Sequence, residues 1–207
     1  MQKNFVAFFL FLVLFGAIPV SCDIICLDSC GCGNNAPPKD FSIQDFKVTD
    51  FLLGQTFNPD FYYPKEDFYK LIEVSDFEFL SQYEHYIPGS GFIQVGIACS
   101  PAPNVSKESI TGIMITTKKQ FGILPEENIE IGSDISGYFL ISNYPSNSAE
   151  TISDYLKSEP RIYLGDGLFL KWNSSLVENL ELVFDLKIEL SNGKIFVFED
   201  EKMMLLK

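Results

Sequence analysis

The chain has few of the residues from which most enzyme sites are built. Its 207 residues include one tryptophan and one histidine, His85, which lies between aromatic residues Tyr83 and Tyr86. A lone histidine among aromatics is expected to be a packed or rim residue, and no second histidine exists to complete a metal site. The sequence also has no phosphate-binding loop and no nucleophile elbow. We therefore predict no catalytic residue, no metal and no cofactor.

Positive charge is scarce as well. Lysine and arginine together number 15 against 28 aspartates and glutamates, so the formal net charge is −13. A chain this acidic repels nucleic acid and anionic membrane surfaces at long range. We therefore predict no nucleic-acid partner.

Long apolar runs are missing too. The longest one, residues 5–18, has no polar side chain, but it is shorter than the roughly 20 residues of a membrane-spanning helix. It follows a single cation, Lys3, and ends just before the small residue Ser21. A basic start, a short apolar middle and a small residue before a break are typical of an export signal. We predict a signal peptide at residues 1–21.

The residue after this segment is Cys22. Ser21 precedes it as a small residue precedes the cysteine at bacterial lipoprotein cleavage sites, although Pro19 stands where that pattern usually has an aliphatic residue. The resemblance implies that Cys22 becomes the first residue and carries acyl chains. We predict lipid attachment at Cys22 and a lipid-anchored location in the cell envelope, on the outer membrane or the periplasmic face. Ordinary secretion is the alternative.

The chain has five cysteines, and four remain once Cys22 is assigned to the lipid: Cys26, Cys30, Cys32 and Cys99. An even number of thiols in an exported chain favours disulfides. Cys30 and Cys32 are too close in sequence to bridge easily. We expect one of them to pair with Cys99 and the other with Cys26. A zinc site and a redox couple fit the spacing less well.

The rest of the chain is predicted to be a short linker followed by one β domain. Residues 22–40 hold the cysteines and a proline pair and are predicted to be a tether, and residues 41–207 are predicted to be the domain. Alternating apolar residues at 181–190, a Ser-Asn-Gly turn and a second run at 194–199 predict a hairpin. Further strands are predicted at residues 68–74, 77–86, 92–99, 110–117, 168–172 and 203–206.

Two short helices are predicted, one capped by Ser133 and one capped by Ser148, and Pro64 leaves a helix over residues 65–72 as an alternative to the first of those strands. Many short strands without regular strand–helix alternation favour an antiparallel immunoglobulin-like β-sandwich with one or two short helices.

Two further groups of residues are candidates for a site. Asp134, Asp154 and Asp166 lie near predicted turns, where a pair of carboxylates would suit hydrolysis, although turn aspartates more often bond to their own backbone. Residues 57–64 contain four aromatic side chains, namely Phe57, Phe61, Tyr62 and Tyr63. In a loop such rings fill a core or bind a sugar or protein ligand, and core filling is the favoured interpretation.

The segment CLDSCGCG after the signal and the C-terminal segment FDLKIELSNGKIFVFEDEKMML resemble small uncharacterised cell-envelope lipoproteins of Bacteroides-type bacteria. The resemblance implies an envelope location and an immunoglobulin-like sandwich, and it supplies no catalytic residue. We predict a non-enzymatic lipoprotein that has a structural role or binds a protein or glycan, with the membrane contacted through the lipid. A secreted hydrolase that uses turn carboxylates is the alternative.

Overall fold

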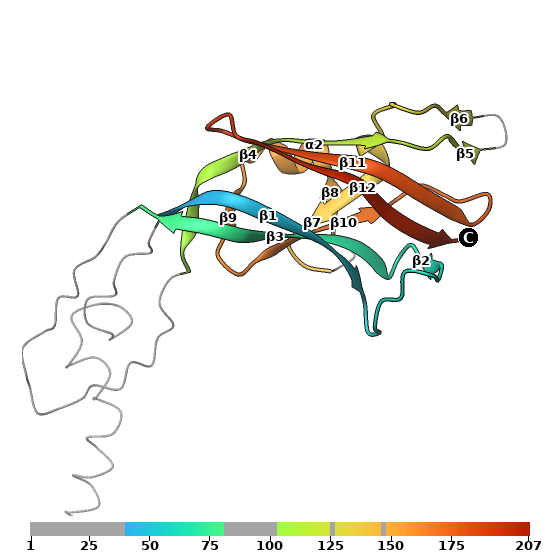
Figure 1. Cartoon of the computed structure of the whole chain (residues 1–207), viewed down its shortest axis with the longest axis horizontal. Coiled ribbons are helices and arrows are strands. Elements are labelled where there is room, and N and C mark those ends of the chain that lie inside the picture. The colour runs from blue at the N-terminus through green and yellow to red at the C-terminus, as the bar shows by residue number, and fades with distance from the viewer. Residues whose placement is uncertain (1–39, 81–102, 125–126, 146–147) are drawn as a thin grey trace, which may run out of the picture. The chain divides into compact units, whose positions relative to one another are not determined.

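The computed structural model describes residues 40–80, 103–124, 127–145 and 148–207 (Figure 1). This part of the chain is mainly β and has two short helices, as predicted. The strands are β1 (Asp40–Leu52), β2 (Tyr63–Pro64), β3 (Phe68–Phe79), β4 (Val105–Thr117), β5 (Phe121–Leu124), β6 (Glu127–Ile129), β7 (Phe139–Ser142), β8 (Glu150–Thr151), β9 (Arg161–Tyr163), β10 (Gly167–Trp172), β11 (Leu180–Leu190) and β12 (Ile195–Leu206). The helices are η1 (Ser136–Tyr138) and α2 (Ile152–Leu156).

Several predictions fall outside the described residues. These are the signal peptide, lipid attachment at Cys22, the four disulfide cysteines, His85 and the strand at residues 92–99. Within the described ranges, no helix has the length and apolar character needed to cross a bilayer.

The main sheet is mixed, so the prediction of a purely antiparallel arrangement is wrong. Its strand order is β2-β12-β11-β4-β1-β3-β10-β7-β8, with β9 paired to β4, and β5 and β6 form a separate pair. Parallel pairing occurs between β1 and β4 and between β12 and β2. β3 runs back along β1 until Phe79 lies opposite Phe41, and β4 starts beside Asp40 at that same end. β4 must therefore run in the direction of β1.

The sheet folds over on itself, with β4 as the shared strand. The start of β4 pairs with β1, whereas residues from Ile110 onward pair with β11. Phe139 of β7 and Phe184 of β11 lie five strands apart in the sheet order, yet their ring centroids are 5.7 Å apart. A flat sheet would separate them by about 24 Å. The two parts of the sheet therefore face each other, which fits a sandwich, while an immunoglobulin-like topology stays a prediction.

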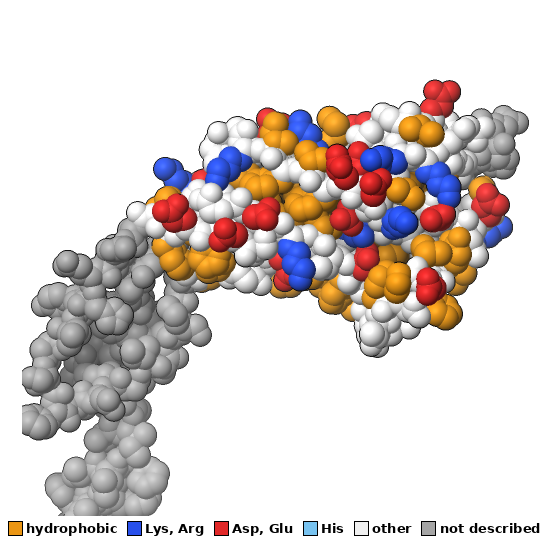
Figure 2. All heavy atoms as spheres, viewed as in Figure 1, with side chains coloured by type: hydrophobic (Ala, Val, Ile, Leu, Met, Phe, Trp, Pro, Cys, Tyr) orange, Lys and Arg blue, Asp and Glu red, His pale blue; other side chains and the backbone are white. Residues whose placement is uncertain are grey.

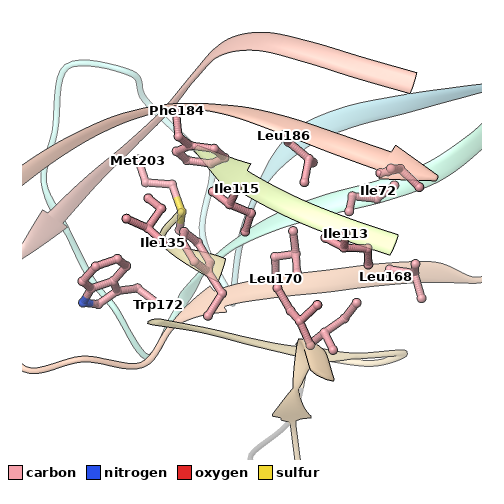
Figure 3. Packing of buried hydrophobic residues seen from close by; sticks show 14 of the residues in the cluster. Ile72, Ile113, Ile115, Ile135, Leu168, Leu170, Trp172, Phe184, Leu186 and Met203 are labelled. Carbon is pink, nitrogen blue, oxygen red and sulfur yellow. The ribbon is translucent and has the colours of Figure 1, made fainter. Parts of the chain in front are cut away.

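One hydrophobic core fills the space between the two parts. Figure 3 shows apolar side chains from β3, β4, β10, β11 and β12 pointing into this common interior. Trp172 and Phe184 are among its largest fully buried side chains. The Trp172 ring stacks on Tyr138 with centroids 5.6 Å apart and meets Phe139 edge-on at 5.5 Å. Burial of such aromatic surface is the main favourable contribution to folding.

The predicted C-terminal hairpin is confirmed. Residues 180, 182, 184, 186, 188 and 190 of β11 are all buried, and the residues between them are half-buried, which matches the alternation read from the sequence. Gly193 in the turn has φ +83°, a conformation that favours glycine. The strand predicted separately at residues 203–206 is the end of β12, because a bulge at Asp200, with φ +57°, lets the strand continue.

The other described strand predictions are confirmed in outline. Residues 110–117 lie in β4 and residues 168–172 in β10. The strands predicted at 68–74 and 77–86 belong to one strand, β3, which ends at Phe79, and residues 81–86 lie outside the described residues. The alternative of a helix after Pro64 is wrong. Its inward positions, which include Phe68 and Ile72, alternate as the pleat requires and fill the core.

Both helices occur close to their predicted positions, but their caps differ from those predicted. The first is a single 3₁₀ turn after Ile135, with no side-chain cap. The second, α2, is capped by Thr151 and not by Ser148: the Thr151 Oγ1 accepts the Asp154 N–H at 3.1 Å. Thr151 lies directly before the first helical residue, where a hydroxyl can reach an unpaired N–H of the first turn.

Candidate functional site

The aromatic loop between β1 and β3 has an anchored side and an exposed side. The Phe57 ring lies 5.8 Å from Tyr63 and 5.5 Å from Phe68, measured between centroids. The Tyr63 hydroxyl accepts the Asn58 N–H at 2.8 Å, which fixes the loop. Phe61, in contrast, is 59% exposed. Core filling is therefore the correct interpretation for Phe57 and Tyr63 but not for Phe61.

A small cavity lies next to this loop. Its volume is about 170 Å³, and its walls come from β2, the loop after β10 and the end of β12. The Lys65 ammonium donates to the Ser174 carbonyl at 2.9 Å, which ties two of these segments together. Leu206 pairs with Pro64 across the parallel β12–β2 contact. The lining residues are Pro64, Lys65, Glu66, Leu176, Leu206 and Lys207.

Several exposed hydrophobic side chains belong to the chain segments that form the cavity wall or directly precede or follow them. We call them the loop-end surface, and Figure 2 shows hydrophobic side chains gathered at the lower right, over the loop that leads into β2. Leu53 follows β1 and bonds through its N–H to the Asp67 carbonyl at 2.9 Å, which places it beside the start of β3. The members of the loop-end surface are Leu53, Phe61, Tyr62, Val177 and Leu206, all exposed.

β1 separates the loop-end surface from the place where the N-terminal segment joins the domain. The strand has 13 residues and starts at Asp40. A strand of this length spans about 40 Å. The Leu80 N–H donates to the Asp40 carbonyl at 3.1 Å, and Val105 pairs with Asp40. Asp40, Leu80 and Val105, at or next to the ends of the described segments, therefore lie together at the Asp40 end of β1.

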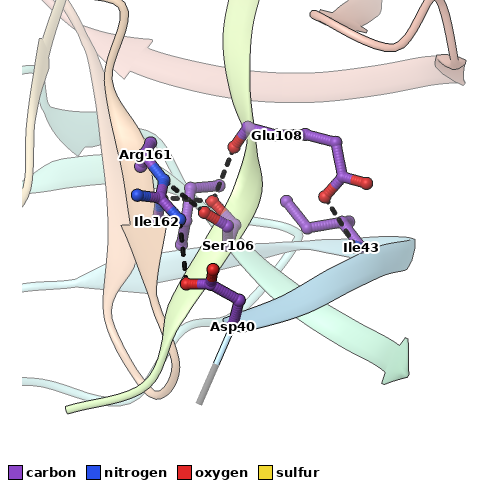
Figure 4. A network of polar contacts seen from close by, with 6 residues as sticks. All are labelled: Asp40, Ile43, Ser106, Glu108, Arg161 and Ile162. Atoms are coloured by element: carbon purple, nitrogen blue, oxygen red, sulfur yellow. Dashed lines mark hydrogen bonds and ion pairs between the residues drawn. The ribbon is translucent and has the colours of Figure 1, made fainter. Parts of the chain in front are cut away.

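A polar network holds the Asp40 end of the domain together (Figure 4). The Ser106 Oγ donates to the Glu108 carbonyl at 2.7 Å and accepts the Ile162 N–H at 2.9 Å. Arg161 donates from Nε to the Ser106 carbonyl and forms an ion pair with Asp40 at 3.1 Å. The network joins β9 and β1 to the first residues of β4.

Glu108 lies where β4 leaves β1 and begins to pair with β11. Its carboxylate accepts the Ser42 hydroxyl at 2.7 Å, the Asn192 amide at 3.1 Å and the Ile43 N–H at 3.3 Å. Burial opposes ionisation and would raise the pKa of Glu108, but these hydrogen bonds outweigh it and hold the pKa below its usual value of 4.5. The carboxylate thus replaces the strand partner that the Ile43 N–H loses when β4 diverges.

We expect Glu108→Gln to lower the free energy of unfolding by about 1–2 kcal/mol at pH 7, because an amide cannot accept every one of these bonds. A lowered folded pKa gives stability that is complete above pH 4.5 and is lost as the pH falls through the folded value. Urea unfolding at pH 7 and pH 3 measures the difference, which should shrink at pH 3. The exposed Glu199→Gln is the control. A difference that does not depend on pH would contradict the role of the charge.

A second buried polar group lies on β3. The Lys70 side chain is 3% exposed, and its ammonium lies 2.6 Å from Asp50 of β1 and 2.7 Å from Glu201 of β12. Buried charges of this kind are retained only when they are paired. The ion pairs therefore connect the two facing parts of the sheet, which is a structural role.

The three candidate carboxylates lie on separate turns. The Asp134 carboxylate accepts the Ser136 N–H at 2.9 Å, and Asp166 is on the turn between β9 and β10, where its N–H bonds to the Tyr163 carbonyl. Asp154 lies in the first turn of α2, where its carboxylate accepts the Thr151 hydroxyl at 2.7 Å, and its hydrogen bond with Lys157 is the main reason why the pKa of its carboxyl is lowered. The Asp134 carboxylate thus bonds to nearby backbone, as turn aspartates commonly do, whereas that of Asp154 bonds to the side chains of Thr151 and Lys157. Hydrolysis by these residues stays an untested alternative.

No group of three or more histidine, cysteine, aspartate and glutamate residues in the described part of the chain is placed to hold a metal ion. Sequence reasoning missed both Glu108 and Lys70. The available signal was the alternation of side chains along a strand, which places both residues on the inward face. Glu108 is two residues from buried Ile110, and Lys70 lies between the inward residues Phe68 and Ile72.

No protein-family model matches this chain, and comparison with curated proteins and with solved structures finds no match.

Proposed function

We propose that the chain is a cell-envelope lipoprotein, held to a membrane through acylated Cys22, with a non-enzymatic binding or structural role. The proposal rests on one observation, that β1 runs from the end where the N-terminal segment is connected to the end that carries the loop-end surface. The segment with Cys22 joins the domain at Asp40, and the exposed aromatic Phe61 lies beyond the other end of the strand, about 40 Å away. The tether is thus connected to the domain at the end of β1 opposite to the loop-end surface, which we propose as the face that binds a protein or glycan ligand.

We propose that Cys99 pairs with Cys30 or Cys32 and that the remaining cysteine of that pair bridges to Cys26. Cys32 lies eight residues before Asp40, and Cys99 lies six residues before Val105. Asp40 and Val105 are paired neighbours. Extended chains of these lengths reach about 27 Å and 20 Å, so both thiols can meet near the Asp40 end. An oxidising compartment, as export provides, is the setting in which such bridges persist.

Incorporation of radiolabelled palmitate tests the tether. We expect the wild type and Cys22→Ala to differ by the whole label, because Cys22 is the proposed site of acylation. Cys26→Ala is the matched control, since it removes a nearby thiol and should keep the label. Equal labelling of the wild type and Cys22→Ala would exclude attachment at Cys22 and favour ordinary secretion.

A further inference from the structure

We propose that β12 binds a second copy of this chain by edge-to-edge strand pairing over residues 194–198. The inference goes beyond the proposed function and does not depend on acylation of Cys22. β12 has β11 on one side and β2 on the other, but β2 pairs only with Leu205 and Leu206. In the described part of the chain, no strand pairs with the edge of residues 194–198 that faces away from β11. We call it the free edge, since an unpaired edge can accept another strand.

Backbone N–H and carbonyl groups point outward along the free edge. The Leu190 N–H donates to the Lys194 carbonyl at 2.9 Å, so the backbone of Lys194 faces β11. Backbone groups alternate in direction along an antiparallel strand, so those of Ile195 and Val197 point away from β11. The N–H and carbonyl groups of both residues are thus available to an added strand.

The side chains along the free edge are apolar. Ile195 and Val197 are 52% and 54% exposed, whereas Phe196 points to the other face, where its ring centroid lies 5.0 Å from that of Phe46 of β1. Residues 195–198 carry no charge. β-Branched side chains such as isoleucine and valine favour strands and stabilise pairs across neighbouring strands. The free edge therefore suits an apolar strand and offers nothing for a charged segment to pair with.

The partly paired strand β1 differs from β12, because side chains bond to its backbone beside β4. β4 pairs with only the first two residues of β1. Beyond them, the Glu108 carboxylate accepts the Ile43 N–H at 3.3 Å, and the Lys194 ammonium donates to the Ile43 carbonyl at 3.0 Å. Among the described residues, no side chain bonds to the backbone of Ile195 or Val197 in this way. β12 is thus the strand whose edge is left open.

A second copy of the same strand complements the free edge. Two antiparallel copies related by a two-fold axis at Phe196 place Ile195 of each copy opposite Val197 of the other. The outward backbone groups then meet each other, and each exposed apolar side chain lies opposite another. A two-fold axis at Val197 would instead place Ile195 opposite Glu199. We therefore assign the register with Phe196 on the axis.

This register also keeps like charges apart. Glu199 lies opposite Gly193 of the other copy, and Asp200 lies opposite Asn192, so each acidic residue faces an uncharged one. The bulge at Asp200 interrupts the regular strand, which limits the contact to residues 194–198. The net charge of −13 still opposes the encounter of two copies. High salt should therefore strengthen the association, because it screens this repulsion.

Sedimentation equilibrium of the full chain in density-matched detergent tests the inference. We expect the wild type to dimerise as its concentration rises. Ile195→Lys/Val197→Lys should weaken dimerisation at least about tenfold, because charges on an edge strand oppose pairing. Met114→Lys is the matched control and should dimerise like the wild type. Met114 is 46% exposed on the same face as Val197, since both pair with Lys187, but it lies two strands from the free edge.

A second variant, Ile195→Lys/Val197→Glu, tests the register. In the proposed pairing each new lysine lies opposite a glutamate of the other copy. This variant should therefore dimerise at least about fivefold more tightly than Ile195→Lys/Val197→Lys. Thermal unfolding should be similar in the wild type and all three variants, because the substituted side chains are exposed.

A wild type that stays monomeric over the whole concentration series would overturn the inference. A dimer that Ile195→Lys/Val197→Lys leaves intact, or that Met114→Lys also loses, would do the same. Equal dimerisation of the two charged β12 variants would contradict the register. Cys22→Ala should dimerise like the wild type, so loss of the palmitate label defeats only the tether and loss of the dimer defeats only the strand pairing.

Discussion

Replacing Phe184 with alanine should lower the free energy of unfolding by about 3–5 kcal/mol. Phe184 is fully buried on β11, and its ring lies 5.7 Å from Phe139 on the facing part of the sheet. Removing the ring loses buried apolar surface and leaves a cavity that close-packed neighbours cannot fill. A domain of ordinary stability, about 5–15 kcal/mol, would lose a large part of its total.

Urea unfolding followed by circular dichroism measures this loss for Phe184→Ala. The matched control is Ile195→Ala on the neighbouring strand β12, where the side chain is 52% exposed and the expected change is below about 0.5 kcal/mol. Similar unfolding midpoints for the two variants would show that β7 and β11 do not share a core.

The second large effect is expected at Lys70. Lys70→Met should lower the free energy of unfolding by about 3 kcal/mol, because it leaves Asp50 and Glu201 as close, partly buried carboxylates without their cation. Their side chains keep 23% and 20% exposure, which places the estimate at the lower end for a broken buried pair.

A triple variant separates lost charge pairing from lost packing. Lys70→Met/Asp50→Asn/Glu201→Gln removes the uncompensated charges, and we expect it to recover at least half of the stability that Lys70→Met loses. Chemical unfolding of the wild type and both variants under the same buffer gives the comparison. A triple variant no more stable than Lys70→Met would show that the ion pairs contribute little.

The local parts of this fold could be predicted from the sequence because their signals are local. Alternation along residues 180–190 and a glycine at the turn define the C-terminal hairpin. Apolar spacing at Ile152 and Tyr155 indicates α2, and both side chains are buried in it. Only neighbouring residues decide these features, so one sequence contains enough information to place them.

Strand neighbours could not be predicted in the same way. β4 lies beside β1 although Val105 and Asp40 are far apart in the sequence. No local sequence pattern indicates that these strands pair or that they run parallel. The bulge at Asp200 was also missed, because its positive φ belongs to an aspartate and not to a glycine. The prediction of two separate strands there follows from that omission.

The candidate site was predicted only as a group of aromatic residues. Phe61 and Tyr63 are two residues apart and chemically alike, yet Tyr63 is buried and Phe61 is exposed. The difference arises from contacts across the fold, since Tyr63 lies against Phe68 and pairs with Leu205 of β12. Composition alone cannot separate an anchoring ring from a ring that faces solvent.

Mass spectrometry of the protein taken from its native compartment, digested without reduction, tests the proposed tether and bridges together. We expect an N-terminal peptide that begins at acylated Cys22 and a crosslinked peptide that joins Cys99 to Cys30 or Cys32. Recovery of an unmodified Cys22 together with four free thiols at Cys26, Cys30, Cys32 and Cys99 would contradict both.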